Sequence, residues 1–193
     1  MRRNMAMFIV ALLVVLSAPV SAQQFTVKSN LLYDLTSTLN LGGEVGLSSQ
    51  WTVDLSANYN PWNFSGNRKM KHWMIQPEAR YWMHRSFAGH FGGAHLIGGG
   101  YNFGGMLPFG IKPSASGLGG NRYQGWMAGA GFSYGYSWLL NDRWGLETSL
   151  GLGFIRFGYD RYDCKTCGEK LGSEKNNYWG PTKAAVSLIY IIK

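Results

Sequence analysis

Histidine and serine side chains are the groups of this chain that could carry out hydrolysis. A hydrolase needs a nucleophile, a base and an orienting group within hydrogen-bond reach. His90 and His95 could act as the base, with Ser133 or Ser149 as the nucleophile. Histidines also occur in the lumen wall of a barrel or near a membrane interface without having a catalytic role. We expect this second role, and we predict a non-enzymatic protein with no catalytic residue, cofactor or metal ion.

The two cysteines, Cys164 and Cys167, form a Cys-Lys-Thr-Cys motif. A structural zinc site usually needs four ligands, and the chain has no second pair of cysteines to supply them. In an exported chain the oxidising surroundings favour a disulfide over a redox-active dithiol. We therefore expect a disulfide that closes a small loop.

Basic residues are concentrated between the predicted strands and at their ends. Arg156 continues an alternating apolar pattern beyond Phe154, and Arg161 follows it. Arginine binds phosphate through paired hydrogen bonds. We expect Arg156 and Arg161 to contact the phosphates of lipopolysaccharide, with solvated loop charges as the alternative. Nucleic acid is not an expected partner of an exported chain.

The first 22 residues have the pattern of a secretory signal peptide. Arg2 and Arg3 precede an apolar run over residues 5–16, and small residues end the segment at Ala22. The apolar run is too short for a membrane-spanning helix, which needs about 20 residues. The sequence therefore predicts a signal peptide, residues 1–22, cleaved after Ala22, and one mature domain, residues 23–193.

The composition excludes a disordered tail and a coiled coil. The chain has 27 glycines in 193 residues, 15% aromatic residues and only 15% charged residues. Disordered segments have high charge and few aromatics, and coiled coils are rich in Ala, Glu, Lys and Leu. The length fits a single domain.

Eight segments are predicted to be strands. In most of them apolar and polar residues alternate with a period of two, which is typical of strands with one apolar face. Trp51, Val53 and Leu55, for example, alternate with Thr52 and Asp54. The segments are 27–35, 41–48, 51–60, 73–83, 90–102, 126–138, 144–154 and 182–192. We expect a bulge at Pro77, and the facing of 90–102 cannot be assigned.

Short and long connections alternate between these segments, as in outer-membrane β-barrels, which have short periplasmic turns and longer outer loops. The tryptophans lie next to the connections and not in mid-strand, as in the aromatic girdles of membrane proteins. We assign Trp51, Trp82, Trp138 and Trp144 to one girdle; Trp62, Trp73, Trp126 and Trp179 form the other. The sequence predicts an eight-stranded antiparallel transmembrane β-barrel with periplasmic termini. A soluble barrel with an apolar interior is the alternative.

Charged residues alternate with the outward-facing apolar residues, so they are expected to face the lumen. These residues are Lys28, Glu44, Asp54, Glu78, Arg80, Glu147 and Lys183. Charges in such a place must pair with one another. We expect a network, centred on Arg80, that plugs the lumen, with small residues such as Gly131 and Gly151 leaving room for the long side chains.

Several local motifs resemble those of a family of small exported barrels from Bacteroidota, known as domain of unknown function 3575. The motifs lie at residues 28–34, 40–44, 59–62, 77–82, 89–91 with His95, 101–105, 160–164 with Cys167, and 180–183. The resemblance implies an outer-membrane barrel that is often encoded near fimbria-like surface genes. It implies no reaction and no binding residues.

Three functions follow from this interpretation. The first is a structural or surface-interaction barrel that acts through its outer loops, with outer-membrane lipid and fimbrial or other surface proteins as expected partners. The second is a lipid-modifying enzyme, such as a lipid A hydrolase. The third is a narrow channel. We favour the first, because paired charges in the lumen would block flow.

Overall fold

The computed structural model describes residues 24–64, 68–104, 122–163 and 168–192. In this part of the chain one five-residue helix, α2 (Leu31–Leu35), accompanies nine strands. The strands are β1 (Phe25–Asn30), β2 (Leu39–Gly46), β3 (Trp51–Asn60), β4 (Asn63–Phe64), β5 (Arg68–Trp82), β6 (Gly89–Gly104), β7 (Arg122–Leu139), β8 (Trp144–Tyr162) and β9 (Lys170–Ile192). The predicted all-β class is confirmed, while the predicted signal peptide lies outside the described residues.

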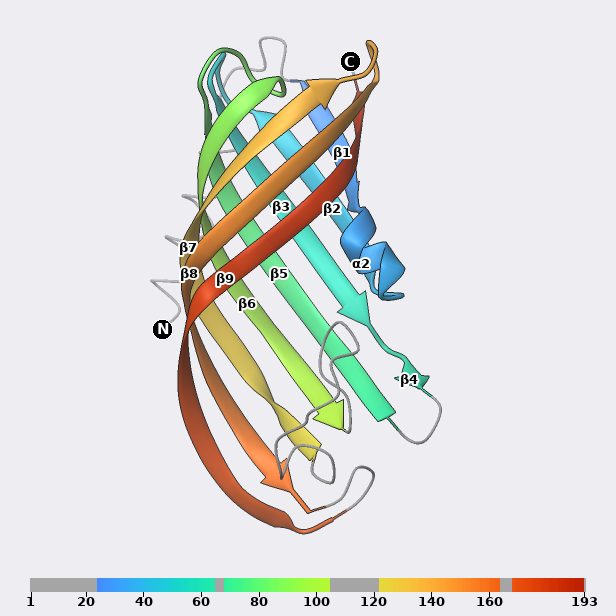
Figure 1. The fold of residues 1–193 in the computed structure, drawn as a ribbon, viewed down its shortest axis with the longest axis vertical. Helices are drawn as coiled ribbons and strands as arrows, with labels where there is room; N and C mark the ends of the chain where they lie inside the picture. Colours follow the sequence, from blue (N-terminus) through green and yellow to red (C-terminus); the bar gives the residue numbers. More distant parts are fainter. Residues whose placement is uncertain (1–23, 65–67, 105–121, 164–167, 193) are drawn as a thin grey trace, which may run out of the picture.

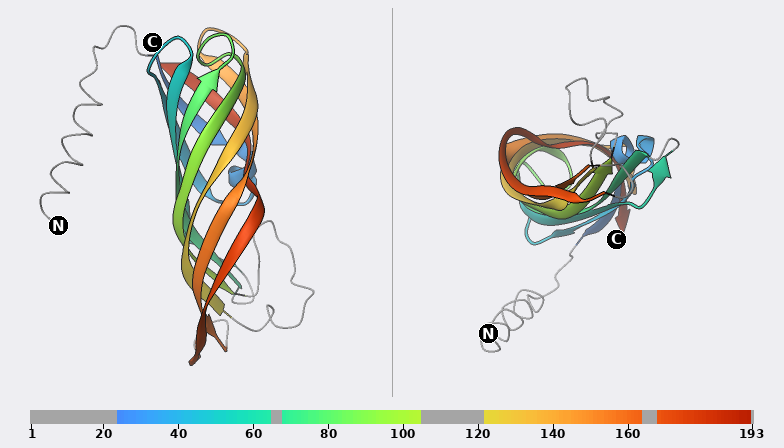
Figure 2. Two further views of the ribbon diagram at one scale, coloured as in Figure 1. Left: turned by 90° about the vertical axis from the view of Figure 1, so that its left-hand side faces the viewer. Right: turned by 90° about the horizontal axis from the view of Figure 1, so that it is seen from below.

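Eight of these strands form one ring-like antiparallel sheet, and β4 is a short extension beside β5. β9 pairs with β1, and β3 pairs with β5, so the order of strands returns to its start (Figures 1 and 2). Short connections join β2 to β3, β5 to β6 and β7 to β8, and we call this the turn end. The opposite end is the loop end. Because Phe25 pairs with Ile192, β1 begins and β9 ends at the turn end.

Burial alternates along the long strands with the predicted period of two. In β7, Phe132 and Tyr134 are exposed on the outside, whereas Ser133 and Gly135, which alternate with them, are buried. The same alternation assigns β6, whose facing the sequence left open: Phe91 and His95 are buried and Leu96 is exposed. Each long strand therefore presents one set of residues to the interior of the ring and the other to its outside.

The predicted first strand, 27–35, is wrong beyond Asn30, where β1 ends and α2 begins. The side-chain oxygen of Asn30 accepts hydrogen bonds from the backbone N–H groups of Leu32, at 3.1 Å, and Val186, at 3.2 Å. Asn30 thus caps the helix and satisfies part of the edge of β9 that a longer β1 would have covered. The helix is built into the wall, because Leu32 lines a groove outside the ring and Tyr33 lines a cavity inside it.

In the described ranges α2 is the only helix. No helix in these ranges is long and apolar enough to cross a membrane.

The bulge predicted at Pro77 is also wrong. Ile75 pairs with Gly98 and Glu78 pairs with His95, so β5 and β6 keep the same register on both sides of the proline. The ladder is interrupted locally, because proline has no N–H to donate, but no extra residue is inserted.

The strands continue much further toward the loop end than the alternating segments predicted. The segment 158–177, which lies between the predicted strands 144–154 and 182–192, is mostly strand, because β8 runs to Tyr162 and β9 begins at Lys170. Most residues of β9 between 170 and 181 are exposed on both faces of the strand. A strand that meets water on both faces needs no apolar side, so the period-two pattern that would reveal it is missing.

Candidate functional site

Seven charged side chains from six strands lie together inside the ring, and we call them the charged cluster. The cluster consists of Lys28 on β1, Glu44 on β2, Asp54 on β3, Glu78 and Arg80 on β5, Glu147 on β8 and Lys183 on β9. Six of the seven are buried, and the Lys183 side chain is only 9% exposed. The structure thus brings together all seven residues that the inward alternation of the sequence singled out.

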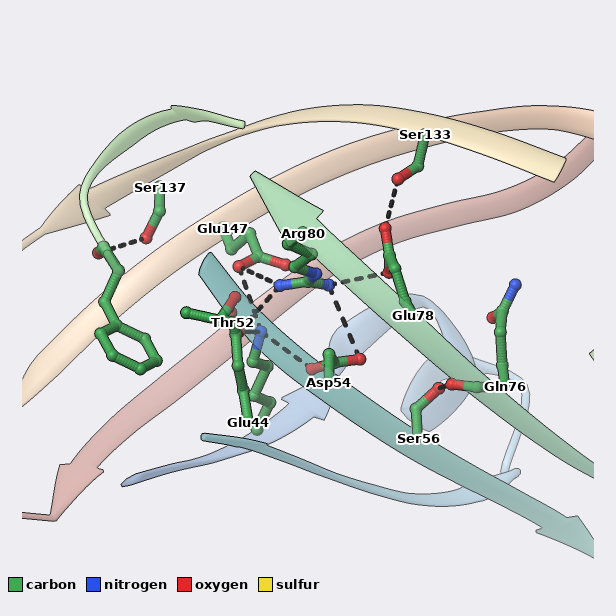
Figure 3. Close-up of polar contacts among 12 residues, drawn as sticks. Glu44, Thr52, Asp54, Ser56, Gln76, Glu78, Arg80, Ser133, Ser137 and Glu147 are labelled. Carbon is green, nitrogen blue, oxygen red and sulfur yellow. Dashed lines mark hydrogen bonds and ion pairs between the residues drawn. The ribbon is translucent and has the colours of Figure 1, made fainter. Parts of the chain in front are cut away.

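Arg80 contacts every carboxylate of the charged cluster (Figure 3). Its guanidinium nitrogens lie 2.9 Å from Glu44, 3.1 Å from Glu147, 3.2 Å from Glu78 and 3.7 Å from Asp54. The group is 1% exposed. An always-charged, planar group with five donors suits a site in which four acceptors converge from different strands.

The two lysines supply the remaining positive charge. Lys28 donates to Glu44, and its Nζ lies 3.0 Å from Asp54 and 3.3 Å from Glu147. Lys183 donates to Glu78. Each buried carboxylate therefore has at least two cationic neighbours, as a buried charge requires.

Neutral donors complete the shell around the carboxylates, although they were not predicted to join the charged cluster. Thr52 donates to Glu44, and Ser133 donates to Glu78. The indole N–H of Trp82 donates to the Thr52 hydroxyl at 2.9 Å. The inward alternation of β3, β5 and β7 includes all three residues, so the signal that found the charges could also have found them.

The predicted placement of Trp82 in an outer aromatic girdle is wrong. Its side chain is 0% exposed, and it packs inside the ring at 4.7 Å from the ring of Phe91. Trp82 follows Arg80 by two residues, so it shares the inward face of β5. Phe91 in turn lies under the guanidinium of Arg80, with 4.6 Å between the Arg80 Cζ and the ring centroid. The other seven tryptophans are exposed.

Inward-facing glycines make room for the long side chains. A Cβ atom on Gly93 would lie 2.2 Å from a Glu78 oxygen and 2.7 Å from the Ser133 hydroxyl. A Cβ atom on Gly131 would lie 2.8 Å from the His95 ring, and one on Gly151 would lie 2.9 Å from it. The interior thus combines large charged and aromatic residues with residues that have no side chain.

A register shift in β9 adds one more polar side chain to the interior. Gly151 pairs with Lys183 while Leu152 pairs with Pro181, so Thr182 is an extra residue between them. The Thr182 hydroxyl lies 2.9 Å from Nε2 of the buried His95, and the next residue, Lys183, also points inward. Bulges commonly redirect a side chain in this way, but the sequence does not reveal their position.

A small polar cavity of about 40 Å³ adjoins the charged cluster. Its lining includes Asn58 and Gln76, whose side-chain amide nitrogens are buried without a hydrogen-bond partner. A buried water needs about 10–15 Å³ and two or more polar partners. The cavity can therefore hold a few water molecules, which would satisfy these donors.

Among the described residues, neither His90 nor His95 forms a hydrogen bond with the candidate nucleophiles Ser133 and Ser149. His95 faces the interior and bonds to Thr182, whereas His90 faces outward, with Nδ1 2.7 Å from the Tyr134 hydroxyl. Residues 131–135, Gly-Phe-Ser-Tyr-Gly, match the Gly-x-Ser-x-Gly pattern. In α/β-hydrolases that pattern forms a sharp strand-to-helix turn. Here it lies inside β7, and Ser133 donates to Glu78 instead of to a histidine.

The remaining predicted site residues lie toward the loop end or outside the described part. Arg156 is exposed on the outer face of β8. Arg161 has the opposite parity and forms an ion pair of 3.6 Å with Glu174. Cys164 and Cys167 lie outside the described residues, so their disulfide stays a prediction. The described residues contain no group of three or more His, Cys, Asp or Glu side chains that could hold a metal ion.

The outer surface of the ring is apolar and aromatic between its two ends. Among its most exposed side chains are Leu41, Leu55, Leu96, Phe132, Leu150, Leu152 and Trp179. Phe132 is 77% exposed, whereas Glu44 and Arg80 are each 1% exposed. Exposed apolar residues around buried charges reverse the distribution in a water-soluble protein, which buries its apolar residues. The interior also holds a smaller apolar cluster of Met74, Ile97 and Ile155.

The fold and the site define a class of all-β protein in which a ring-like antiparallel sheet encloses paired charges and exposes apolar side chains. A family model described as "Protein of unknown function (DUF3575)" matches residues 7–192. The chain belongs to this family, as its motifs indicated. The comparisons with curated proteins and with solved structures gave no significant match.

Proposed function

We propose that the chain is an eight-stranded β-barrel of the outer membrane whose lumen is closed by the charged cluster, and that it acts through its loop end as a surface-interaction or envelope protein without enzymatic activity. The single observation that carries this proposal is the reversed polarity. A closed sheet leaves no unpaired edge over most of its length, which suits lipid. Apolar residues outside and polar residues inside are the pattern of transmembrane barrels.

The closed lumen rests on the geometry of the charged cluster. A barrel of eight strands is just wide enough to be filled by side chains. Arg80 reaches carboxylates on β2, β3, β5 and β8, so it bridges opposite sides of the ring. Paired charges of this kind block the path that water and ions would need, which argues against a channel.

The loop end presents exposed polar side chains that a partner protein could contact. At this end β8 runs to Tyr162 and β9 begins at Lys170. Both strands carry exposed polar side chains here, such as Asp160 and Lys170, which form an ion pair of 2.9 Å. Fimbrial or other surface proteins are the partners that we propose. A lipid-modifying enzyme is a poorer account, because His90 and His95 lie on opposite faces of β6.

The membrane topology can be tested by labelling cysteines at the two ends of the ring. We expect an Asn63→Cys variant, with Cys164 and Cys167 replaced by serine, to react with an impermeant thiol reagent in intact cells. Asn63 is exposed at the loop end, whereas Asp142 is exposed in the turn that joins β7 to β8. The matched Asp142→Cys variant should react only after the outer membrane is permeabilised.

Two results would contradict the proposal. Labelling of the Asp142→Cys variant, but not of Asn63→Cys, in intact cells would reverse the orientation. Labelling of neither variant until the cells are permeabilised would show that neither end of the ring is exposed at the cell surface.

A further inference from the structure

An apolar groove of about 820 Å³ lies on the outside of the ring across β6, β7, β8 and β9, strands that lie side by side (Figure 2). Its lining includes the small, outward-facing residues Ala94 and Ala130, flanked by the exposed Phe132 and Leu152. The small residues create the hollow, because their neighbours on the same strands carry large side chains. At the loop-end side, Phe154 and Trp179 close the groove, with 5.0 Å between their ring centroids.

Two cations lie next to the loop-end side of the groove, on the same outer face of the ring. Arg156 follows Phe154 by two residues on β8, and its cross-strand partner on β9 is Asn177. Lys175 is two residues from Asn177 and shares its face, so the Cα atoms of Arg156 and Lys175 are about 7–8 Å apart. Both side chains are exposed, and within the described ranges neither forms an ion pair. One phosphate, or two neighbouring phosphates, can therefore be reached by both.

We propose that this groove and its two cations form a binding site for a phosphate-bearing lipid of the outer leaflet. One acyl chain lies in the groove against Phe132 and Leu152, and the phosphate is held by Arg156 and Lys175. This inference rests on the proposed location of the chain in the outer membrane. It also revises the sequence-based expectation, because Arg161 pairs with Glu174 on the opposite face of β8 and Lys175 takes its place.

The charge beyond the groove favours a lipid over a second copy of the chain. Among the described residues, the outer face of the neighbouring strands presents no exposed carboxylate at the level of Arg156. Asp160, further toward the loop end, is already paired with Lys170 and Ser173. A second copy docking through its own apolar face would leave both cations without a partner. An anionic lipid supplies both an apolar chain for the groove and a negative head for the two cations, and charge-assisted hydrogen bonds to phosphate are the stronger kind.

The test measures retention of lipid A by native mass spectrometry, after the full chain has been inserted into phosphatidylcholine vesicles containing lipid A and extracted with mild detergent. We expect the wild type to retain one lipid A molecule. An Arg156→Gln/Lys175→Gln variant should bind lipid A about tenfold more weakly or worse, because it loses two contacts to charged groups. Ala130→Trp should also abolish retention, because it fills the groove without changing charge.

The matched control is Arg85→Gln/Arg143→Gln, which removes two exposed cations at the turn end and should retain lipid A like the wild type. Equal retention by all variants would overturn the inference, since the lipid would then be part of a non-specific shell. A dimer that Ala130→Trp dissociates would also overturn it, in favour of a second copy in the groove. Failure of the wild type to insert into vesicles would instead contradict the proposed function, and heat-modifiable gel mobility shows that each variant is folded.

Discussion

Replacing Arg80 with alanine is expected to destabilise the folded chain by about 3–5 kcal/mol, the usual cost of removing one partner from a buried ion pair. The substitution leaves Glu44, Asp54, Glu78 and Glu147 with only two lysines between them. Glu78 and Glu147 each lose a contact of 3.2 Å or less. The Phe91 ring also loses the cation that lies over it. No neighbouring donor can replace a group that reaches four carboxylates at once.

The measurement is the temperature at which the protein loses its heat-modifiable mobility on a gel. We expect this temperature to fall for Arg80→Ala and to stay near the wild-type value for Ala79→Val. Ala79 precedes Arg80 in β5 but is exposed on the outer face, so valine there keeps the surface apolar. If Arg80→Ala melted like the wild type, the charged cluster would have no role in closing the ring.

Gly153→Ala is expected to destabilise the chain by about 1–3 kcal/mol, as other insertions into closely packed sites do. Gly153 pairs with Gly131 across β8 and β7. A Cβ atom on Gly153 would lie 2.3 Å from the carbonyl oxygen of Ala130 and 2.5 Å from the Cα of Gly131. These are backbone atoms, so relief requires the two strands to move apart.

The matched control is Gly98→Ala in β6, because a Cβ atom at Gly98 would meet nothing within 4 Å. Alanine there reduces the freedom of the unfolded chain, so we expect unchanged or slightly higher stability. Denaturation of both variants by urea in detergent micelles separates them. Equal midpoints for Gly153→Ala and Gly98→Ala would show that the close approach of β7 and β8 does not constrain residue 153.

The period-two pattern was enough to predict the sheet and the members of the charged cluster. A one-sided strand must place every second residue inward, so Glu78 and Arg80 could be assigned to the same face without a structure. The same rule places Trp82 inside, although its closeness to a turn favoured a position in an aromatic girdle. The sequence of β6 is rich in glycine, so its two faces could not be told apart before Phe91 and His95 were seen to be buried.

Other features depend on the whole ring and leave no local trace. The level at which Lys28, Glu147 and Lys183 meet depends on how the strands are staggered around the ring, which alternation within one strand does not contain. The extra residue Thr182 shifts the register of β9 only because Gly151 and Leu152 pair as they do. The helix α2 replaces the end of a strand because Asn30 bonds to Val186, a residue more than 150 positions away.

The central claim is that this chain is a membrane-embedded ring whose interior is closed by paired charges, and conductance tests it most directly. Wild-type protein would first be inserted into vesicles, with insertion verified by heat-modifiable mobility and by flotation with the lipid. The same vesicles would then be fused with a planar bilayer. We predict no steady conductance from the wild type, because Arg80 and its four carboxylates occupy the path. A stable, reproducible conductance from verified wild-type protein would contradict the claim and identify the chain as a narrow channel.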